Sequence, residues 1–204
     1  KNYIIRRSIN LSKQVQIIAA NIDCLFLVIS LKNPTTTFGF VDRFLVGAEA
    51  YRIPTVLIYN KVDLLISEDA KIELENWKTI YKKADYPQIE LSAIKGNGVN
   101  QLRELMKDKV SIFSGNSGVG KSTLINALDP SFNLRVSEIS EVHNSGRHTT
   151  TFAELFNLSF GAKIIDTPGI KNLSFNNFEP MDVAHNFREF FEASKNCKYS
   201  SSES

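Results

Sequence analysis

A phosphate-binding pattern occupies the middle of the chain. The stretch GNSGVGKST matches G-x-x-x-x-G-K-[ST], and it lies between an apolar run and a helix-forming run, as the pattern requires. Glycines let successive backbone N–H groups point at phosphate oxygens, and the following helix adds its positive end. We expect Lys121 to reach the β and γ phosphates and assist their transfer, and Ser122 to bind Mg²⁺ through its hydroxyl. The residues expected to contact the nucleotide here are Gly115, Asn116, Ser117, Gly118, Val119, Gly120, Lys121, Ser122 and Thr123.

A second motif, DTPG, suits the phosphate side of the same site. Asp166 follows the apolar residues KII, so it would stand at the carboxyl end of a strand and hold Mg²⁺ through a water molecule. Gly169 can donate its backbone N–H to the γ-phosphate because it has no side chain to block the approach. DTPG alone also occurs as an ordinary turn. In a chain with a phosphate-binding loop we interpret it as part of the nucleotide site.

The stretch NKVD follows the apolar run LIY and has residue types that can recognise guanine. The carboxylate of Asp63 can accept from both N1–H and the N2 amine of guanine, whereas adenine offers an unpaired acceptor at that edge. The aliphatic stem of Lys61 can lie along the flat base, and Asn60 can tie this loop to the phosphate loop. The alternative is a surface turn after a strand, so this interpretation depends on the neighbouring motifs.

The stretch SAIKGNG is a candidate second base loop. A backbone N–H near Ala93 would donate to the O6 atom of guanine, and we place Ser92 and Ala93 in the nucleotide site. The alternative is a glycine-containing loop that merely precedes a helix.

These motifs follow one another in a rotated order. An ordinary GTPase has its phosphate loop first, whereas here both base loops precede it and DTPG comes last. Joining the close ends of a sheet and cutting the chain elsewhere leaves each loop at the carboxyl end of its own strand, where ligands bind in α/β sheets. We therefore expect a circularly permuted site that still works.

The elements that must position these loops alternate along the chain. We predict strands at 23–30, 55–59, 88–91, 110–114, 151–158 and 163–166, and helices at 40–51, 68–83, 100–107, 121–128 and 181–193. This alternation predicts an α/β fold of the P-loop NTPase class, with a mostly parallel sheet, helices on both faces and a partial C-terminal helical segment. The apolar residues predicted to pack are Ile72, Leu74, Trp77 and Ile80 of the second helix and Phe187, Phe190 and Phe191 of the last.

Composition excludes several other classes of protein. The 204 residues are 43% hydrophobic and 23% charged, which excludes a disordered chain, and the net charge of +2 gives little general reason to bind nucleic acid. Two cysteines, Cys24 and Cys197, are too few for a disulfide framework or a complete zinc site. We see no run long enough to span a membrane and no cleavable signal, so we expect a cytoplasmic protein without a membrane partner.

Taken together, these motifs make the sequence strongly resemble the circularly permuted GTPases of the RsgA (YjeQ/EngC) type, which are bacterial small-subunit ribosome biogenesis factors. The residues that carry the likeness are DRFLV, NKVD, SAIKGNG, SGNSGVGKSTLINAL, GRHTTT and DTPGI, and the likeness runs from about Arg6 to Tyr199. The resemblance implies hydrolysis of GTP to GDP, stimulation by the small ribosomal subunit, contact with its rRNA, and a switch role in late subunit maturation. We expect the protein to act as a monomer.

The resemblance also implies a domain plan. Members generally have an N-terminal OB-fold domain, the GTPase domain and a C-terminal zinc-binding domain. We expect residues 1–20 to be a linker from a missing N-terminal domain, 21–172 to be the GTPase domain, and 173–204 to begin the helical, zinc-binding region. Cys197 resembles the first Zn²⁺ ligand, but no further cysteine follows it, so the zinc site is incomplete in this chain.

The residue that activates water for hydrolysis has the least direct signal in the sequence. Ras-like enzymes place a water-orienting glutamine just after the Asp-x-x-Gly glycine, where this chain has Ile170. We expect His148 to orient the attacking water instead, because the resemblance places a catalytic histidine there. We expect Thr150, or alternatively Thr149, to give Mg²⁺ a second hydroxyl. Two alternatives stay open: a guanine-nucleotide-sensing module with negligible hydrolysis, and an ATPase.

Overall fold

The computed structural model describes residues 2–7, 15–132, 154–166 and 180–195. Six of its strands form one sheet in the order β5–β4–β3–β6–β8–β7, and only the pairing of β7 with β8 is antiparallel. These strands are β3 (Cys24–Ile29), β4 (Thr55–Tyr59), β5 (Gln88–Glu90), β6 (Val110–Ser114), β7 (Glu154–Asn157) and β8 (Lys163–Asp166). The predicted mostly parallel α/β sheet is therefore confirmed.

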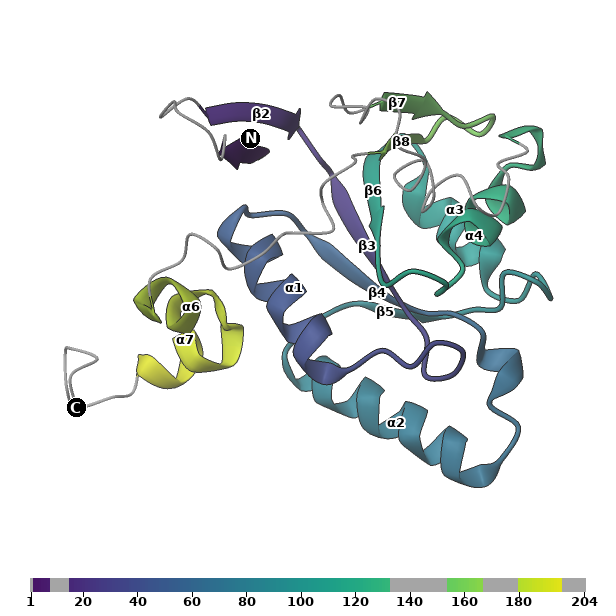
Figure 1. Ribbon diagram of the computed structural model, residues 1–204, viewed down its shortest axis with the longest axis horizontal. Helices are drawn as coiled ribbons and strands as arrows, with labels where there is room; N and C mark the ends of the chain where they lie inside the picture. Colours follow the sequence, from purple (N-terminus) through teal and green to yellow (C-terminus); the bar gives the residue numbers. More distant parts are fainter. Residues whose placement is uncertain (1, 8–14, 133–153, 167–179, 196–204) are drawn as a thin grey trace, which may run out of the picture.

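Helices cover both faces of this sheet (Figure 1). On one side lie α1 (Phe38–Ala50) and α2 (Glu68–Lys83), and on the other lie α3 (Val99–Met106) and α4 (Lys121–Leu128). Successive residues of a strand point to opposite faces. Leu25 and Leu27 of β3 accordingly pack with α1 and α2, whereas Phe26 and Val28 pack with α3 and α4. All four are 0% exposed, so β3 is the centre of the core.

Side-chain caps fix where the two helices of the first layer begin. The hydroxyl of Thr37 accepts from the backbone N–H of Phe40 at the start of α1, and that of Ser67 accepts from the N–H of Ala70 at the start of α2. Helix α2 also has acidic residues in its first turn and basic residues in its last, which complements the helix dipole.

The packed face of α2 is turned relative to the prediction. Leu74 and Trp77 are buried as expected, but Ile72 is 57% exposed and Ile80 is 46% exposed, so their prediction as core residues is wrong. The buried positions are Ala70, Leu74, Trp77 and Tyr81, whose spacing of three or four residues keeps them on one face of the helix. Ile72 lies two residues from Ala70 and therefore points away from that face.

The N-terminal segment contains two strands where we expected a linker. Strands β1 (Tyr3–Arg7) and β2 (Val15–Ala20) pair antiparallel, with Tyr3 opposite Ala20. The side chain of Asn2 joins them to the main domain, because it accepts from the N–H of Ile22 at 2.8 Å and donates to the Ile22 carbonyl at 2.7 Å. Within the described residues, the expected linker is thus partly a two-stranded sheet.

The predicted C-terminal helix is two short helices. They are α6 (Pro180–Asn186) and α7 (Arg188–Ser194), separated at Phe187, whose backbone is extended. Both lie beside α1 (Figure 1). The expectation that the phenylalanine stripe packs is wrong for Phe190 and Phe191, which are 58% and 46% exposed. Among the described helices, none is long and apolar enough to cross a bilayer.

Candidate functional site

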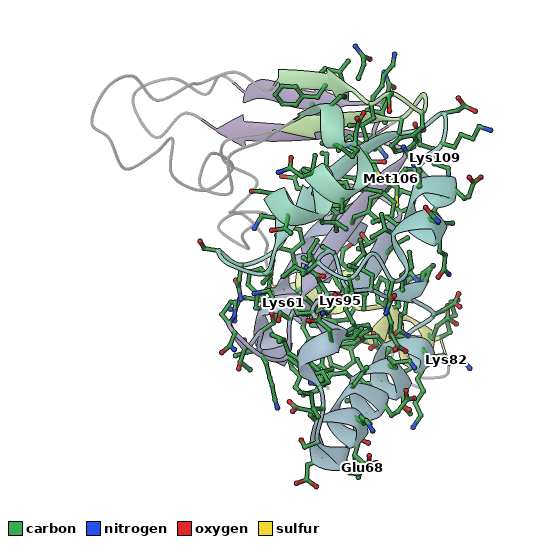
Figure 2. All side chains as sticks on the ribbon, turned by 90° about the vertical axis from the view of Figure 1, so that its right-hand side faces the viewer. Lys61, Glu68, Lys82, Lys95, Met106 and Lys109 are labelled. Atoms are coloured by element: carbon green, nitrogen blue, oxygen red, sulfur yellow. The ribbon has the colours of Figure 1, made fainter. Side chains whose placement is uncertain are left out.

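The carboxyl ends of β4, β5 and β6 carry the predicted base and phosphate loops at one edge of the sheet. Figure 2 shows the labelled Lys61 and Lys95, one from each base loop, at the same level of the molecule. Strands β3 and β6 are neighbours although the chain visits β4 and β5 between them. The loops after β3 and β6 therefore leave adjacent strands and lead to helices on opposite faces of the sheet, α1 and α4. Ligands of α/β sheets bind at such a point.

Asn60 joins three of the loops with one buried amide. Its Nδ2 donates to the carbonyl of Val119 at 2.8 Å, and its Oδ1 accepts from the backbone N–H of Ala93 at 3.1 Å. Asn60 is 4% exposed, so both bonds are shielded from water. The prediction that Asn60 ties the base loop to the phosphate loop is in agreement with this geometry, which adds the second base loop to the same tie.

Asp63 and Ser92 bind each other across the two base loops. The Ser92 hydroxyl donates to a carboxylate oxygen of Asp63 at 2.5 Å, and Ser92 is 0% exposed. The loops are joined again by their backbones, because the N–H of Val62 donates to the carbonyl of Leu91 at 3.3 Å. Ser92 therefore orients the carboxylate that we expect to read guanine, which is a different role from direct contact with the nucleotide.

The backbone N–H of Ala93 already has a partner. We expected an N–H near this residue to donate to guanine O6, but in this structure the N–H of Ala93 donates to Asn60. Lys95, two residues further along the loop, donates its own N–H to the Ser92 hydroxyl at 3.2 Å. Donation of a hydrogen bond from the second base loop to O6 of guanine stays a prediction.

Lys61 crosses from the base loop to the phosphate loop. Its Nζ donates to the carbonyl of Gly118 at 2.7 Å and to that of Asn33. Burial lowers the pKa of Lys61 from its usual value, and the nearby carboxylate of Asp63 partly opposes that shift. The ammonium group is thus held at the phosphate loop, and the expected contact of the stem with the purine stays a prediction.

The phosphate loop needs glycine at two positions. Gly115 has φ +143°, and a Cβ there would lie 2.3 Å from the carbonyl oxygen of Val28 in β3. Gly120 has φ +98°, and a Cβ there would lie 2.4 Å from Nδ2 of Asn60. Either contact is impossible for a real side chain, so these glycines let the loop close against β3 and the base loop.

Lys121 begins α4 and reaches back across the loop. Its Nζ donates to the carbonyls of Gly115 and Asn116 at 2.7 and 2.8 Å. Ser122 follows in the first turn of α4 and is 6% exposed. The ammonium group thus lies at the phosphate loop, close to the N-terminus of α4, and both groups suit an anionic ligand.

The oxygen groups present suit Mg²⁺. Asp166 is the last residue of β8, one step beyond Ile165, which pairs with Ile112 of β6. Its backbone therefore lies next to the end of β6, where the phosphate loop with Ser122 begins. A hydroxyl and a carboxylate are ligands that this hard cation prefers. Within the described residues, no group of three or more histidine, cysteine or acidic side chains forms a further candidate metal site.

Several predicted site residues lie outside the described part of the chain. They are His148, Thr150, Gly169 and Cys197, and the side chain of Asp166 is likewise outside it. Their proposed contacts with water, Mg²⁺, the γ-phosphate and Zn²⁺ stay predictions.

One loop at the site was missed from the sequence. Residues 30–37, between β3 and α1, place the Asn33 carbonyl on Lys61 and Pro34 beside Gly118. The one signal in the sequence was position, because the loop after a central parallel strand lies at the same edge as the phosphate loop.

Comparison with known proteins agrees with this geometry. A family profile described as RsgA GTPase matches residues 1–176. The chain is 51% identical over 201 residues to the small ribosomal subunit biogenesis GTPase RsgA of Flavobacterium johnsoniae, covering 98% of this chain and 61% of that protein. It is 50% identical over 199 residues to the protein of the same name from Bacteroides fragilis, covering 98% of this chain and 64% of the relative.

Two solved structures resemble the fold. The crystal structure of YjeQ from Thermotoga maritima has a TM-score of 0.76 and 36% identity, over 98% of this chain and 62% of the other. YloQ, described as a circularly permuted GTPase, has a TM-score of 0.69 and 29% identity, over 88% and 56% of the two chains. The predicted permutation is therefore confirmed, and the chain spans about three fifths of the curated relatives it matches. By its sequence and by its fold, the chain belongs to the RsgA GTPase family.

Proposed function

We propose that this chain binds GTP and GDP with Mg²⁺ and hydrolyses GTP to GDP and phosphate. The observation that carries the proposal is the buried amide of Asn60, which bonds the phosphate loop at Val119 and the second base loop at Ala93. A guanine reader and a triphosphate cradle joined by a single side chain can act on one nucleotide. Residues Asp63 and Lys121 then bind the two ends of the same ligand.

Each described residue has a part in this reaction. Asp63, oriented by Ser92, accepts from the N1–H and N2 amine of guanine, and the stem of Lys61 lies along the ring. Lys121 stabilises negative charge on the β and γ phosphates. Ser122, Thr150 and Asp166 would hold Mg²⁺, which when bound neutralises further charge on the phosphates.

Water activation is assigned to residues outside the described part of the chain. We propose that His148 accepts a hydrogen bond from the attacking water, since Ile170 has no polar group to do so. Gly169 would donate its backbone N–H to the γ-phosphate. A low intrinsic rate follows from the lack of the usual glutamine, and a ribosomal partner would raise it.

The relatives' names support a biological role. They are described as small ribosomal subunit biogenesis GTPases. We propose that the whole protein acts in the cytoplasm as a monomeric switch in late maturation of the small subunit and contacts its rRNA. Cys197 would be the first ligand of the family's Zn²⁺, whereas the other cysteine of the sequence, Cys24, lies buried in the core.

Two measurements on this chain test the proposal. Titration calorimetry should give GDP an affinity at least about 100-fold above that of ADP, because a site that pairs with a polar edge rejects a base lacking it. Single-turnover hydrolysis of GTP should then accelerate when small ribosomal subunits are added. Equal affinity for ADP would indicate an ATPase, and hydrolysis unaffected by subunits would favour a guanine-nucleotide-sensing module.

A further inference from the structure

The loop at residues 30–37 is closed by a reciprocal pair of hydrogen bonds. The backbone N–H of Thr36 donates to the Ser30 carbonyl at 2.8 Å, and the backbone N–H of Ser30 donates to the Thr36 hydroxyl at 3.2 Å. Both residues are 1% exposed. The Ser30 hydroxyl donates in turn to the carbonyl of Lys32 at 2.5 Å. Two buried hydroxyls therefore fix the shape of a loop whose middle residues are more exposed.

The middle of this loop contacts the nucleotide-binding motifs on two sides. The carbonyl of Asn33 accepts from Nζ of Lys61, and the same Nζ donates to the carbonyl of Gly118 in the phosphate loop. Pro34 lies beside Gly118, since a Cβ atom added to Gly118 would lie 3.4 Å from Cδ of Pro34. Lys61 is thus held between two loops, and one of them depends on Thr36 for its shape.

We propose that Thr36 is a positioning residue of the nucleotide site, which acts by holding the Asn33 carbonyl where it fixes Lys61 along the purine. This inference rests on the proposed binding of guanine nucleotides. It assigns a role to a buried threonine outside the sequence motifs, in the loop between β3 and α1 that contacts the base loop through Lys61 and the phosphate loop through Gly118.

The physical reason is the flexibility of lysine. A lysine stem has four rotatable bonds, and it keeps one orientation only where the ammonium group has fixed acceptors. If the Gly118 carbonyl were its only acceptor, Nζ of Lys61 would make one hydrogen bond and the side chain could still change its orientation. The Asn33 carbonyl supplies the second contact, so the stem is already in place when the base arrives, and less conformational entropy is lost on binding.

The test compares four variants by GDP affinity and by the dissociation rate of a fluorescent GDP analogue. Thr36→Val keeps the shape of the side chain but removes the acceptor, and it should raise the Kd for GDP about tenfold, mainly through faster dissociation. Thr36→Ser restores the hydroxyl and should return the Kd to within about twofold of the wild type. Ser30→Ala should give a smaller loss, about threefold. Thr79→Val, a matched change at an exposed position of α2, should change nothing.

A double-mutant cycle with Lys61→Met separates positioning from general damage. Lys61→Met keeps an apolar stem without the ammonium group, so adding Thr36→Val or Ser30→Ala should weaken GDP binding by less than about twofold further. Thermal unfolding of each variant shows that it is folded. If Thr36→Val does not fold, the same cycle with Ser30→Ala gives the answer.

Three results would overturn the inference while leaving guanine-nucleotide binding intact. They are wild-type affinity in Thr36→Val, failure of Thr36→Ser to rescue, and an undiminished effect of Thr36→Val in the Lys61→Met background. A wild-type chain that does not bind GDP would instead overturn the proposed function, and the inference with it.

Discussion

Asn60 is the residue at which the loops of the candidate site meet. A buried amide has a donor and an acceptor side, and here each side bonds the backbone of a different loop, at Val119 and at Ala93. The same side chain explains why Gly120 must be glycine, because a Cβ there would overlap Nδ2. The Asn-Lys-x-Asp sequence is thus a structural joint, in addition to its proposed role in reading the base.

Substitution of Asn60 should damage both stability and binding. Asn60→Ala leaves the Val119 carbonyl and the Ala93 N–H buried without their partner, which should lower the free energy of unfolding by about 1–3 kcal/mol. It should also weaken GDP binding at least about tenfold, because the base loops lose their connection to the phosphate loop. Urea unfolding and calorimetry measure the two effects. Asn76→Ala, at an exposed position of α2, is the matched control, and an Asn60→Ala protein with unaltered GDP affinity would contradict the role assigned to this joint.

At the scale of elements, Arg188 joins helix α7 to α1 and to the segment that follows α2. Its guanidinium pairs with Glu49 of α1 at 2.8 Å, donates to the carbonyl of Asp85 at 2.7 Å and lies 4.1 Å from the ring centre of Tyr86. The Tyr86 hydroxyl also donates to Glu49 at 3.2 Å. Arginine suits this position because its planar group can stack and donate in several directions at once.

Removal of Arg188 should release α7 without unfolding the core. Arg188→Ala should speed backbone amide exchange in α6 and α7 by roughly tenfold, while exchange in α2 stays the same. Arg188→Lys should speed amide exchange in α6 and α7 almost as much, because an ammonium group cannot make the contacts of the planar guanidinium group. Lys195→Ala is a suitable control, since Lys195 pairs with Glu192 of its own helix. Equal exchange in wild type and Arg188→Ala would show that other contacts hold these helices.

The elements differ in how well sequence predicts them, and the reasons are physical. Apolar runs such as the one in β3 indicate a buried parallel strand by themselves, and a motif such as Asn-Lys-x-Asp identifies its loop. The break at Phe187 could not be predicted, because the phenylalanine spacing continues across it. The loop containing Thr36 was missed for a similar reason, since bonds between hydroxyls and backbone groups leave no periodic pattern.

At the scale of the molecule, the order of the sheet is independent of where the chain begins. The strands that carry the base loops come first in the chain, yet β3 and β6 are neighbours in the sheet and the phosphate loop follows β6. Each loop stays at the carboxyl end of its own strand. The permutation also changes which elements follow β8, the strand that ends at Asp166 of the DTPG motif. The chain continues beyond β8 to α6 and α7, which lie against α1 (Figure 1).

The measurement that tests the shared site most directly is a change of base specificity. Xanthine has a carbonyl at C2 where guanine has an amine, so the amide of Asp63→Asn can donate to it. Calorimetry should show that Asp63→Asn binds GDP about 100-fold more weakly than the wild type and prefers xanthosine diphosphate. Lys121→Ala should weaken both nucleotides without changing the preference. If Asp63→Asn kept the wild-type affinity for GDP over xanthosine diphosphate, Asp63 and the phosphate loop would not bind the same nucleotide.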